Sequence, residues 1–118
     1  MIAQDEITGY VAKEIPELSG VCNTEQCRNA YDVARYMIRY VNEQFVNKNL
    51  AGAKKCLRLA EDLYNNGNKT VKNAIENVFV YSFSHSFFTE HERKKQLLSI
   101  LPGSLYTIYK SQVLASHL

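Results

Sequence analysis

The chain has 118 residues, of which 46% are hydrophobic and 22% are charged, with five glycines and two prolines. This composition excludes collagen-like, low-complexity and disordered proteins, and the length suits one domain spanning 1–118. No apolar run approaches the roughly 18–20 residues that a membrane-spanning helix needs. The first residues lack a basic segment followed by an apolar stretch, so we expect a cytoplasmic location and no membrane partner.

Charge and cysteine content narrow the possible ligands. The formal net charge is only +2, whereas domains that bind nucleic acid usually cluster their bases and have an isoelectric point above about 9, so we expect no nucleic-acid partner. Three cysteines, an odd number, do not suggest a disulfide framework. Cys22 and Cys27, with His85 and His91, are spaced too loosely for a typical zinc site. We therefore expect no metal and no cofactor, and leave open whether Cys22 and Cys27 form a disulfide.

Apolar residues recur at spacings of three and four along most of the chain, which is the pattern of amphipathic helices. A first short helix is predicted over residues 3–15. A second begins near Asn23 or Thr24, both good capping residues, and runs to Phe45. A third covers residues 50–66. Because the connections are short, consecutive helices are expected to pack antiparallel.

The fourth predicted helix is the ambiguous one. Gly67 stands where a left-handed residue commonly ends a helix, and Asn68 is placed to cap the next helix from Lys69 onward. Residues 81–87 then alternate with a period of two, which is typical of a strand. We predict a helix here, because no breaker precedes this run and no other segment could pair with it as a strand.

Two further helices complete the expected fold. Thr89 to Glu92 has the form of a capping box that begins a short fifth helix ending near Leu101. The pair Pro102-Gly103 separates it from a sixth helix. The sequence therefore predicts an all-α fold, an irregular antiparallel bundle of five or six helices.

Residues suited to catalysis are few. Cys27 and Cys56 fall on the apolar arcs of predicted helices, where cysteine usually behaves as a small buried hydrophobe. His85 projects into the apolar arc of the fourth helix beside Ser82 and Ser86. The favoured interpretation is a core histidine with hydrogen-bonded ring nitrogens, rather than a catalytic base. We therefore predict no enzyme and no catalytic residue, with a small enzyme that uses His85 as an alternative.

Two groups of residues exceed what the core of a monomer needs, and both are candidates for binding a partner. Tyr36, Arg39 and Tyr40 lie at the edge between the apolar and charged faces of the second helix, and tyrosine beside arginine is enriched at interface hot spots. The second group, at the end of the fourth helix, consists of Val80, Phe83, Phe87 and Phe88.

Each group also has an alternative interpretation. The two tyrosines could pack their rings at the boundary and expose their hydroxyls, or could bind RNA together with Arg39. A helix that is apolar on all sides is either central in its own domain or covered by another chain. The fourth helix fits both descriptions.

A family resemblance is carried by three stretches, Leu59–Asn68, Val71–Phe79 and Leu98–Leu105. Here the chain resembles a family of small, uncharacterised, all-helical bacterial proteins. Proteins of this size and style are similar to immunity proteins, which bind and neutralise a toxin made by the same or a neighbouring cell. Immunity proteins that act on nucleases tend to be acidic, whereas this chain is slightly basic, so a nuclease is not the expected target.

The resulting prediction is a non-catalytic protein-binding module, immunity-like in style, with a protein partner or self-association. The alternative is a helical-hairpin scaffold or homodimer in the tetratricopeptide style, which residues 49–60 suggest. One such unit is visible, and about three are needed for a stacked repeat.

Overall fold

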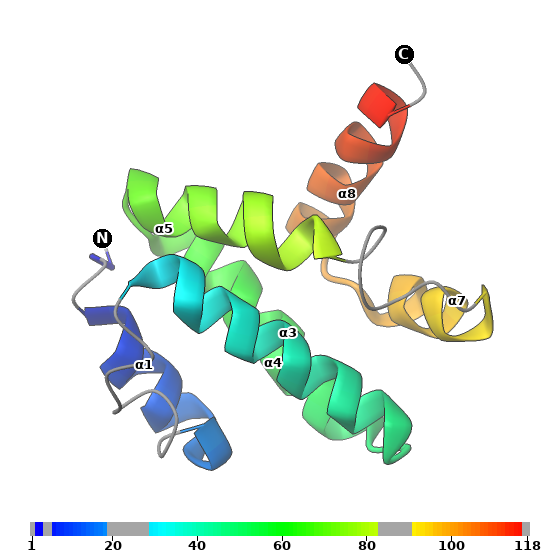
Figure 1. Ribbon diagram of the computed structural model, residues 1–118, viewed down its shortest axis with the longest axis horizontal. Helices are drawn as coiled ribbons and strands as arrows, with labels where there is room; N and C mark the ends of the chain where they lie inside the picture. The colour runs from blue at the N-terminus through cyan, green and yellow to red at the C-terminus, as the bar shows by residue number, and fades with distance from the viewer. Residues whose placement is uncertain (1, 4–5, 19–28, 83–90, 117–118) are drawn as a thin grey trace.

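The computed structural model describes residues 2–3, 6–18, 29–82 and 91–116, and the all-α class and irregular bundle are confirmed (Figure 1). The α-helices are α1 (Ile7–Glu14), α3 (Ala30–Val46), α4 (Leu50–Asn66), α5 (Lys69–Ala74), α7 (His91–Ile100) and α8 (Gly103–Ser116). Two shorter segments are the 3-10 helix η2 (Pro16–Leu18) and the π-helix η3 (Ile75–Val80), which continues α5.

The N-terminal helix begins later than predicted. It starts at Ile7, and the backbone at Ile2 pairs instead with the turn at Gly67, where Asn68 N donates a hydrogen bond to the Ile2 carbonyl at 2.8 Å. The predicted inward residues of this segment, Ile7, Val11 and Ile15, are all fully buried. The predicted inward face of this helix is therefore confirmed, whereas the predicted start at residue 3 is wrong.

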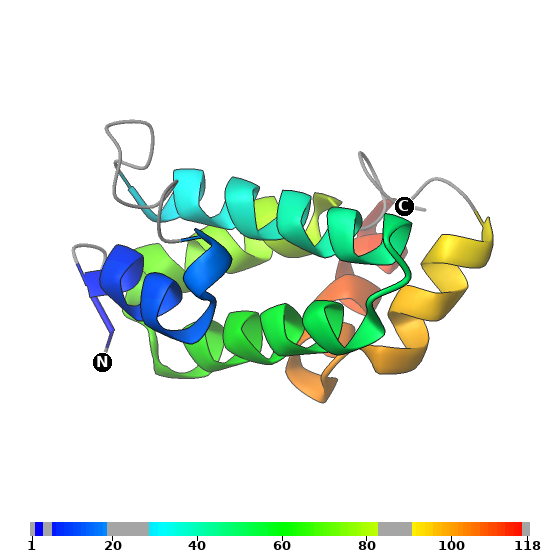
Figure 2. The same cartoon turned by 90° about the horizontal axis from the view of Figure 1, so that it is seen from below.

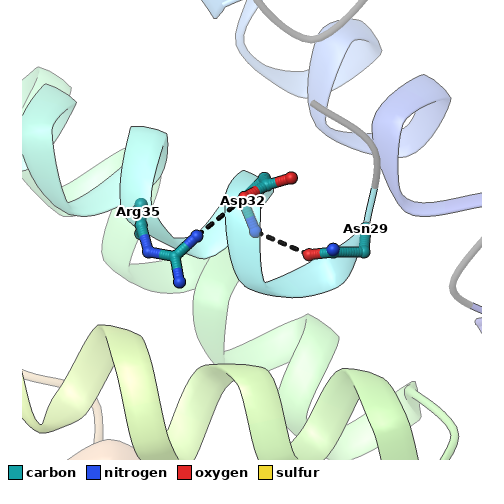
Figure 3. Close-up of polar contacts among 3 residues, drawn as sticks. All are labelled: Asn29, Asp32 and Arg35. Carbon is teal, nitrogen blue, oxygen red and sulfur yellow. Dashed lines mark hydrogen bonds and ion pairs between the residues drawn. The ribbon is translucent and has the colours of Figure 1, made fainter. Parts of the chain in front are cut away.

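Helix α3 begins at an asparagine cap. The Asn29 backbone is extended, and its side-chain oxygen accepts a hydrogen bond from Asp32 N at 3.0 Å (Figure 3). This arrangement satisfies one of the backbone donors that a helix start leaves without a partner. Because Asn29 is extended, α3 starts at Ala30, and the prediction of one continuous helix from Asn23 or Thr24 is wrong; those two residues lie outside the described part of the chain.

Helices α3 and α4 form an antiparallel hairpin (Figure 2). Helix α4 has the predicted bounds, and the Asn49 side chain caps it by accepting from Gly52 N at 3.1 Å. Cys56 on its inner face donates to the Met37 carbonyl with an Sγ–O distance of 3.6 Å, and burial raises the pKa of its thiol. The buried residues of α4 are Ala53, Cys56, Leu57, Leu59, Ala60 and Leu63.

Gly67 joins α4 to α5, but not through the left-handed backbone that the sequence suggested. Its φ of −79° and ψ of 160° are extended, so that prediction is wrong. Glycine is needed here for space: a Cβ atom would meet the Leu63 carbonyl and would lie 2.5 Å from Val71 Cγ1. The predicted cap that follows is confirmed, since Asn68 Oδ1 accepts from Val71 N at 3.1 Å.

The helix after Asn68 changes character partway along. Its second part, η3, is π-helical, with hydrogen bonds to the fifth residue along the chain instead of the fourth. The wider turn rotates later residues away from their α-helical projection. Val80, a predicted partner-binding residue that an α-helical projection places opposite Val78, is fully buried. Because η3 packs against three separate helices, α3, α4 and α8, this part of the helix is central in the fold.

The period-two run that followed is described only in part. Ser82 is helical, and its hydroxyl donates to the Val78 carbonyl one turn earlier at 2.7 Å. The prediction of helix over strand is therefore confirmed as far as Ser82. The remainder of the run lies outside the described residues, as does Thr89 of the predicted capping box.

Helix α8 is attached to the rest of the fold by two long-range polar contacts. Ser104 N, in its first turn, donates to Glu61 Oε2 of α4 at 3.1 Å. Farther along, Gln112 Nε2 donates to the Glu76 carbonyl of η3 at 2.8 Å. The apolar residues Leu97 of α7 and Leu105, Ile108 of α8 join the core.

Candidate protein-binding surface

The three predicted residues of the second helix meet at one groove. Tyr36, Arg39 and Tyr40 are spaced so that they share one side of α3, and there they line a hollow of about 370 Å³ between α3 and η2. We call this hollow the η2 groove. Its other lining residues are Glu17, Leu18, Glu43 and Gln44.

Tyr40 forms a fixed wall of the η2 groove. Its side chain is buried against the core, and its hydroxyl donates to Glu17 Oε2 at 3.1 Å, which ties η2 to α3. Burial, and then the hydrogen bond to Glu17, raise the pKa of Tyr40 to about 12. The hydroxyl therefore stays protonated at neutral pH and holds the Glu17 carboxylate in place.

Arg39 and Tyr36 form a stacked pair at the rim of the same groove. The guanidinium carbon of Arg39 lies 5.5 Å from the centroid of the Tyr36 ring, within the range of a cation–π contact. Arg39 is exposed and Tyr36 is half-buried. The ring thus holds a charged, planar donor group at the surface, where a partner can contact it.

A second groove lies on the other side of Arg39. It measures about 260 Å³ and runs between α3 and η3, and we call it the η3 groove. Because Arg39 lines both grooves, its side chain forms the ridge between them. The other lining residues of the η3 groove are Arg35, Ile38, Asn77, Val78, Tyr81 and Ser82.

Arg35 and Tyr81 mark the two sides of the η3 groove. The Arg35 guanidinium makes an ion pair with Asp32 of the preceding turn, with an Nη1–Oδ1 distance of 2.7 Å (Figure 3). Across the groove, Tyr81 follows η3 and leaves 47% of its surface exposed. Sequence reasoning missed both residues. Arg35 belonged to an ordinary charged face, and the position of Tyr81 depends on the π-helical turn.

The second predicted group does not form a described surface. Val80 is in the core, so it is not a surface residue. Phe83, Phe87, Phe88 and the alternative catalytic residue His85 lie outside the residues that the structure describes.

The described residues contain neither a candidate metal site nor a membrane-spanning helix. Within 2–3, 6–18, 29–82 and 91–116, no group of three or more His, Cys, Asp or Glu side chains is arranged to hold a metal ion. Cys22 and Cys27 are not among these residues. None of the helices in the same ranges is both long and apolar enough to cross a membrane.

These features define an all-helical protein with a grooved face along one helix. The family model described as "Domain of unknown function (DUF7674)" matches residues 8–115, and the chain therefore belongs to this family. The matched range includes all three stretches on which the family resemblance was based. No curated protein and no solved structure gives a significant match to the chain.

Proposed function

We propose that the chain is a non-catalytic protein-binding module, and that its binding surface is the side of α3 that carries the two grooves. The observation behind this proposal is the position of Arg39, stacked on Tyr36 and shared by both grooves. Tyrosine and arginine are enriched among the residues that dominate binding energy at interfaces, above all where a partner excludes water from them. A partner that covered both grooves would enclose Arg39 from two sides.

The construction of the η2 groove also favours binding. Tyr40 is held by Glu17 across the groove wall, and α3 is capped by Asn29. A surface that is already ordered loses little conformational entropy when a partner binds, so more of the contact energy appears as affinity.

The immunity-like role extends this proposal. We propose that the partner is a toxin-like protein, which this chain neutralises in the cytoplasm of a bacterium. Neutralisation needs only tight binding, so a module without catalytic machinery suffices. The slight positive charge of the chain would not complement a basic nuclease, which favours a target of another kind.

The experiment uses the product of a neighbouring toxin-like gene in the native host, mixed with the purified chain and followed by calorimetry and by relief of growth inhibition. The variant Arg39→Glu removes the shared ridge and is expected to weaken binding about 30-fold, the effect of a 2 kcal/mol hot spot. Lys54→Glu is the matched control, because it makes the same charge change at an exposed position of α4 that lines neither groove.

Three results would contradict the proposal. Binding that survives Arg39→Glu unchanged would place the interface elsewhere, and equal losses in the two variants would indicate a general charge effect. Turnover of any substrate by the chain would contradict the non-catalytic role. Light scattering of the chain alone shows whether self-association occupies the same surface, since Arg39→Glu would then also dissociate the assembly.

A further inference from the structure

The two grooves differ in charge. The lining of the η3 groove, within the described part of the chain, includes two arginines and no acidic side chain. The η2 groove is lined by Arg39 together with Glu17 and Glu43. Asp32 pairs with Arg35 beside the η3 groove, which leaves one positive charge in excess there. A single negatively charged group would therefore be attracted to the η3 groove and repelled from the η2 groove.

The spacing of the two arginines suits a carboxylate. Arg35 and Arg39 are four residues apart on α3, so they are neighbours on one side of the helix. Arginine presents its donors in a planar fork that matches a carboxylate with two parallel hydrogen bonds. Within the chain itself, Arg35 binds the Asp32 carboxylate through one such hydrogen bond, from Nη1 to Oδ1 (Figure 3).

The remaining lining is suited to a peptide. Ile38 and Val78 give the groove an apolar part, and the exposed side chain of Asn77 supplies an amide. The Tyr81 ring stands at the edge, 47% exposed. Together these residues offer apolar contact, a neutral hydrogen-bonding group and positive charge in one hollow of about 260 Å³.

The backbone gives an independent reason to expect function here. Asn77 and Val78 belong to the π-helical segment η3, and such segments occur frequently at functional sites. η3 contacts α3, and Asn77 and Val78 of the wide turn line one side of the groove.

From these observations, and given the proposed protein-binding function, we propose that the η3 groove binds an acidic segment of the protein partner, with a carboxylate held between Arg35 and Arg39. A nucleic acid or a membrane would bring many phosphates at once. Such a polyanion would meet the carboxylates of Glu17 and Glu43 in the η2 groove as well as that of Asp32, whereas a carboxylate confined to the η3 groove would meet only Asp32, which already pairs with Arg35.

The test is selection from a library of random short peptides displayed on phage, using the full chain as bait. We expect the enriched peptides to carry Asp or Glu beside an apolar residue. By fluorescence anisotropy, the double variant Arg35→Gln/Arg39→Gln should bind a selected peptide at least about tenfold more weakly. Replacing the peptide's acid by its amide should have a similar effect.

Two further variants separate binding from folding. Lys54→Gln/Lys55→Gln removes the same charge from exposed residues of α4 and should change the affinity by less than about twofold. Asn77→Asp keeps both arginines and the Asp32 ion pair, but adds a negative charge to the groove. This variant should also bind the acidic peptide more weakly than the wild type does, while the two proteins unfold at the same temperature.

The contrary outcomes are distinct from failure of the proposed function. Selected peptides without acidic residues, or acidic peptides that ignore the Arg35 and Arg39 changes, would overturn this inference, and the effect of Arg39→Glu on the toxin-like partner would stand by itself. The same holds if no peptide is enriched. Tighter binding of single-stranded RNA, or of phosphatidylserine vesicles, lost in the same double variant, would replace the acidic segment with a phosphate ligand.

Discussion

Helix α4 and the π-helical segment η3 both pack against α3, but they are held in different ways. Helix α4 keeps an exposed charged side, with Lys54, Lys55 and Arg58, opposite the face that it buries. By contrast, η3 packs against three other helices, α3, α4 and α8, and only Asn77 of its residues is exposed. A helix that packs on one face can therefore keep regular α-helical geometry, whereas the geometry of a helix packed against several neighbours also depends on those neighbours.

The largest expected effect compares one buried residue from each region. Phe79 of η3 and Leu57 of α4 are both fully buried. If the π-helical segment is packed as tightly as the regular helix, Phe79→Ala should lower the free energy of unfolding by about 3–5 kcal/mol, and Leu57→Ala by about 2–5 kcal/mol. Equilibrium unfolding in urea measures both. A loss below about 1 kcal/mol for Phe79→Ala alone would contradict tight packing of η3.

Helix α4 was predictable because its signals are local. Gly67 correctly marked its C-terminal end, although through close packing and not a left-handed backbone, and its apolar residues keep one period throughout. The start of α3 could not be predicted in this way, because the sequence has several residues before it that are good helix caps. The choice of Asn29 over Asn23 or Thr24 depends on where the backbone becomes extended. Val80 was misplaced because a projection with a fixed α-helical period does not hold through a π-helical turn.

The candidate surface also contains residues that the sequence could predict and residues that it could not. Tyr36, Arg39 and Tyr40 could be grouped from the sequence, because they are three and four residues apart on one helix. Their partners could not. Glu17 reaches Tyr40 across 23 positions of sequence, and Tyr81 reaches the η3 groove through the packing of η3 on α3. Such contacts depend on tertiary structure, which residue spacing does not encode.

The next largest effect is expected at Gly67, which joins α4 to the helix that contains η3. Gly67→Ala would place a methyl group against the Leu63 carbonyl and Val71 Cγ1, so we expect a loss of about 1–3 kcal/mol in unfolding free energy. Gly9→Ala is the control: it lies inside α1 with nothing within 4 Å of the added Cβ. It should stabilise the protein by about 0.5–1 kcal/mol. Thermal unfolding of both variants tests the opposite signs, and equal signs would contradict the close approach at Gly67.

The smallest effect belongs to α3 and its contact with η2. Tyr40→Phe removes the hydrogen bond to Glu17 and should cost about 1–2 kcal/mol at neutral pH. The pKa of Tyr40 is about 12 in the folded state, against 10.0 for an ordinary tyrosine. Because the folded-state value is the higher one, this stabilisation is complete below pH 10 and is lost as the pH rises toward 12.

Urea unfolding of wild type and Tyr40→Phe at several pH values tests this dependence. Burial raises the pKa of Tyr10 and Tyr109 as well, so both proteins should lose stability in alkali, and only the difference between them reports on Tyr40. The difference in unfolding free energy between wild type and Tyr40→Phe should become smaller above pH 10. A constant difference up to pH 12 would show that the Tyr40 hydroxyl does not contribute in this way.

The π-helical turn of η3 has a consequence for how the family can vary in length. Each turn of such a segment contains about one residue more than an α-helical turn. A homologue that lacked one residue between Ile75 and Val80 could close the gap by reverting to a regular helix, without breaking the chain's path. The residues after the gap would then keep their orientation about the helix axis, because the wide turn absorbs the residue that is lost, and the residue at the position of Tyr81 would stay at the rim of the groove. A one-residue deletion here would thus leave the fold and that rim in place and alter only the wall of the groove that Asn77 and Val78 form.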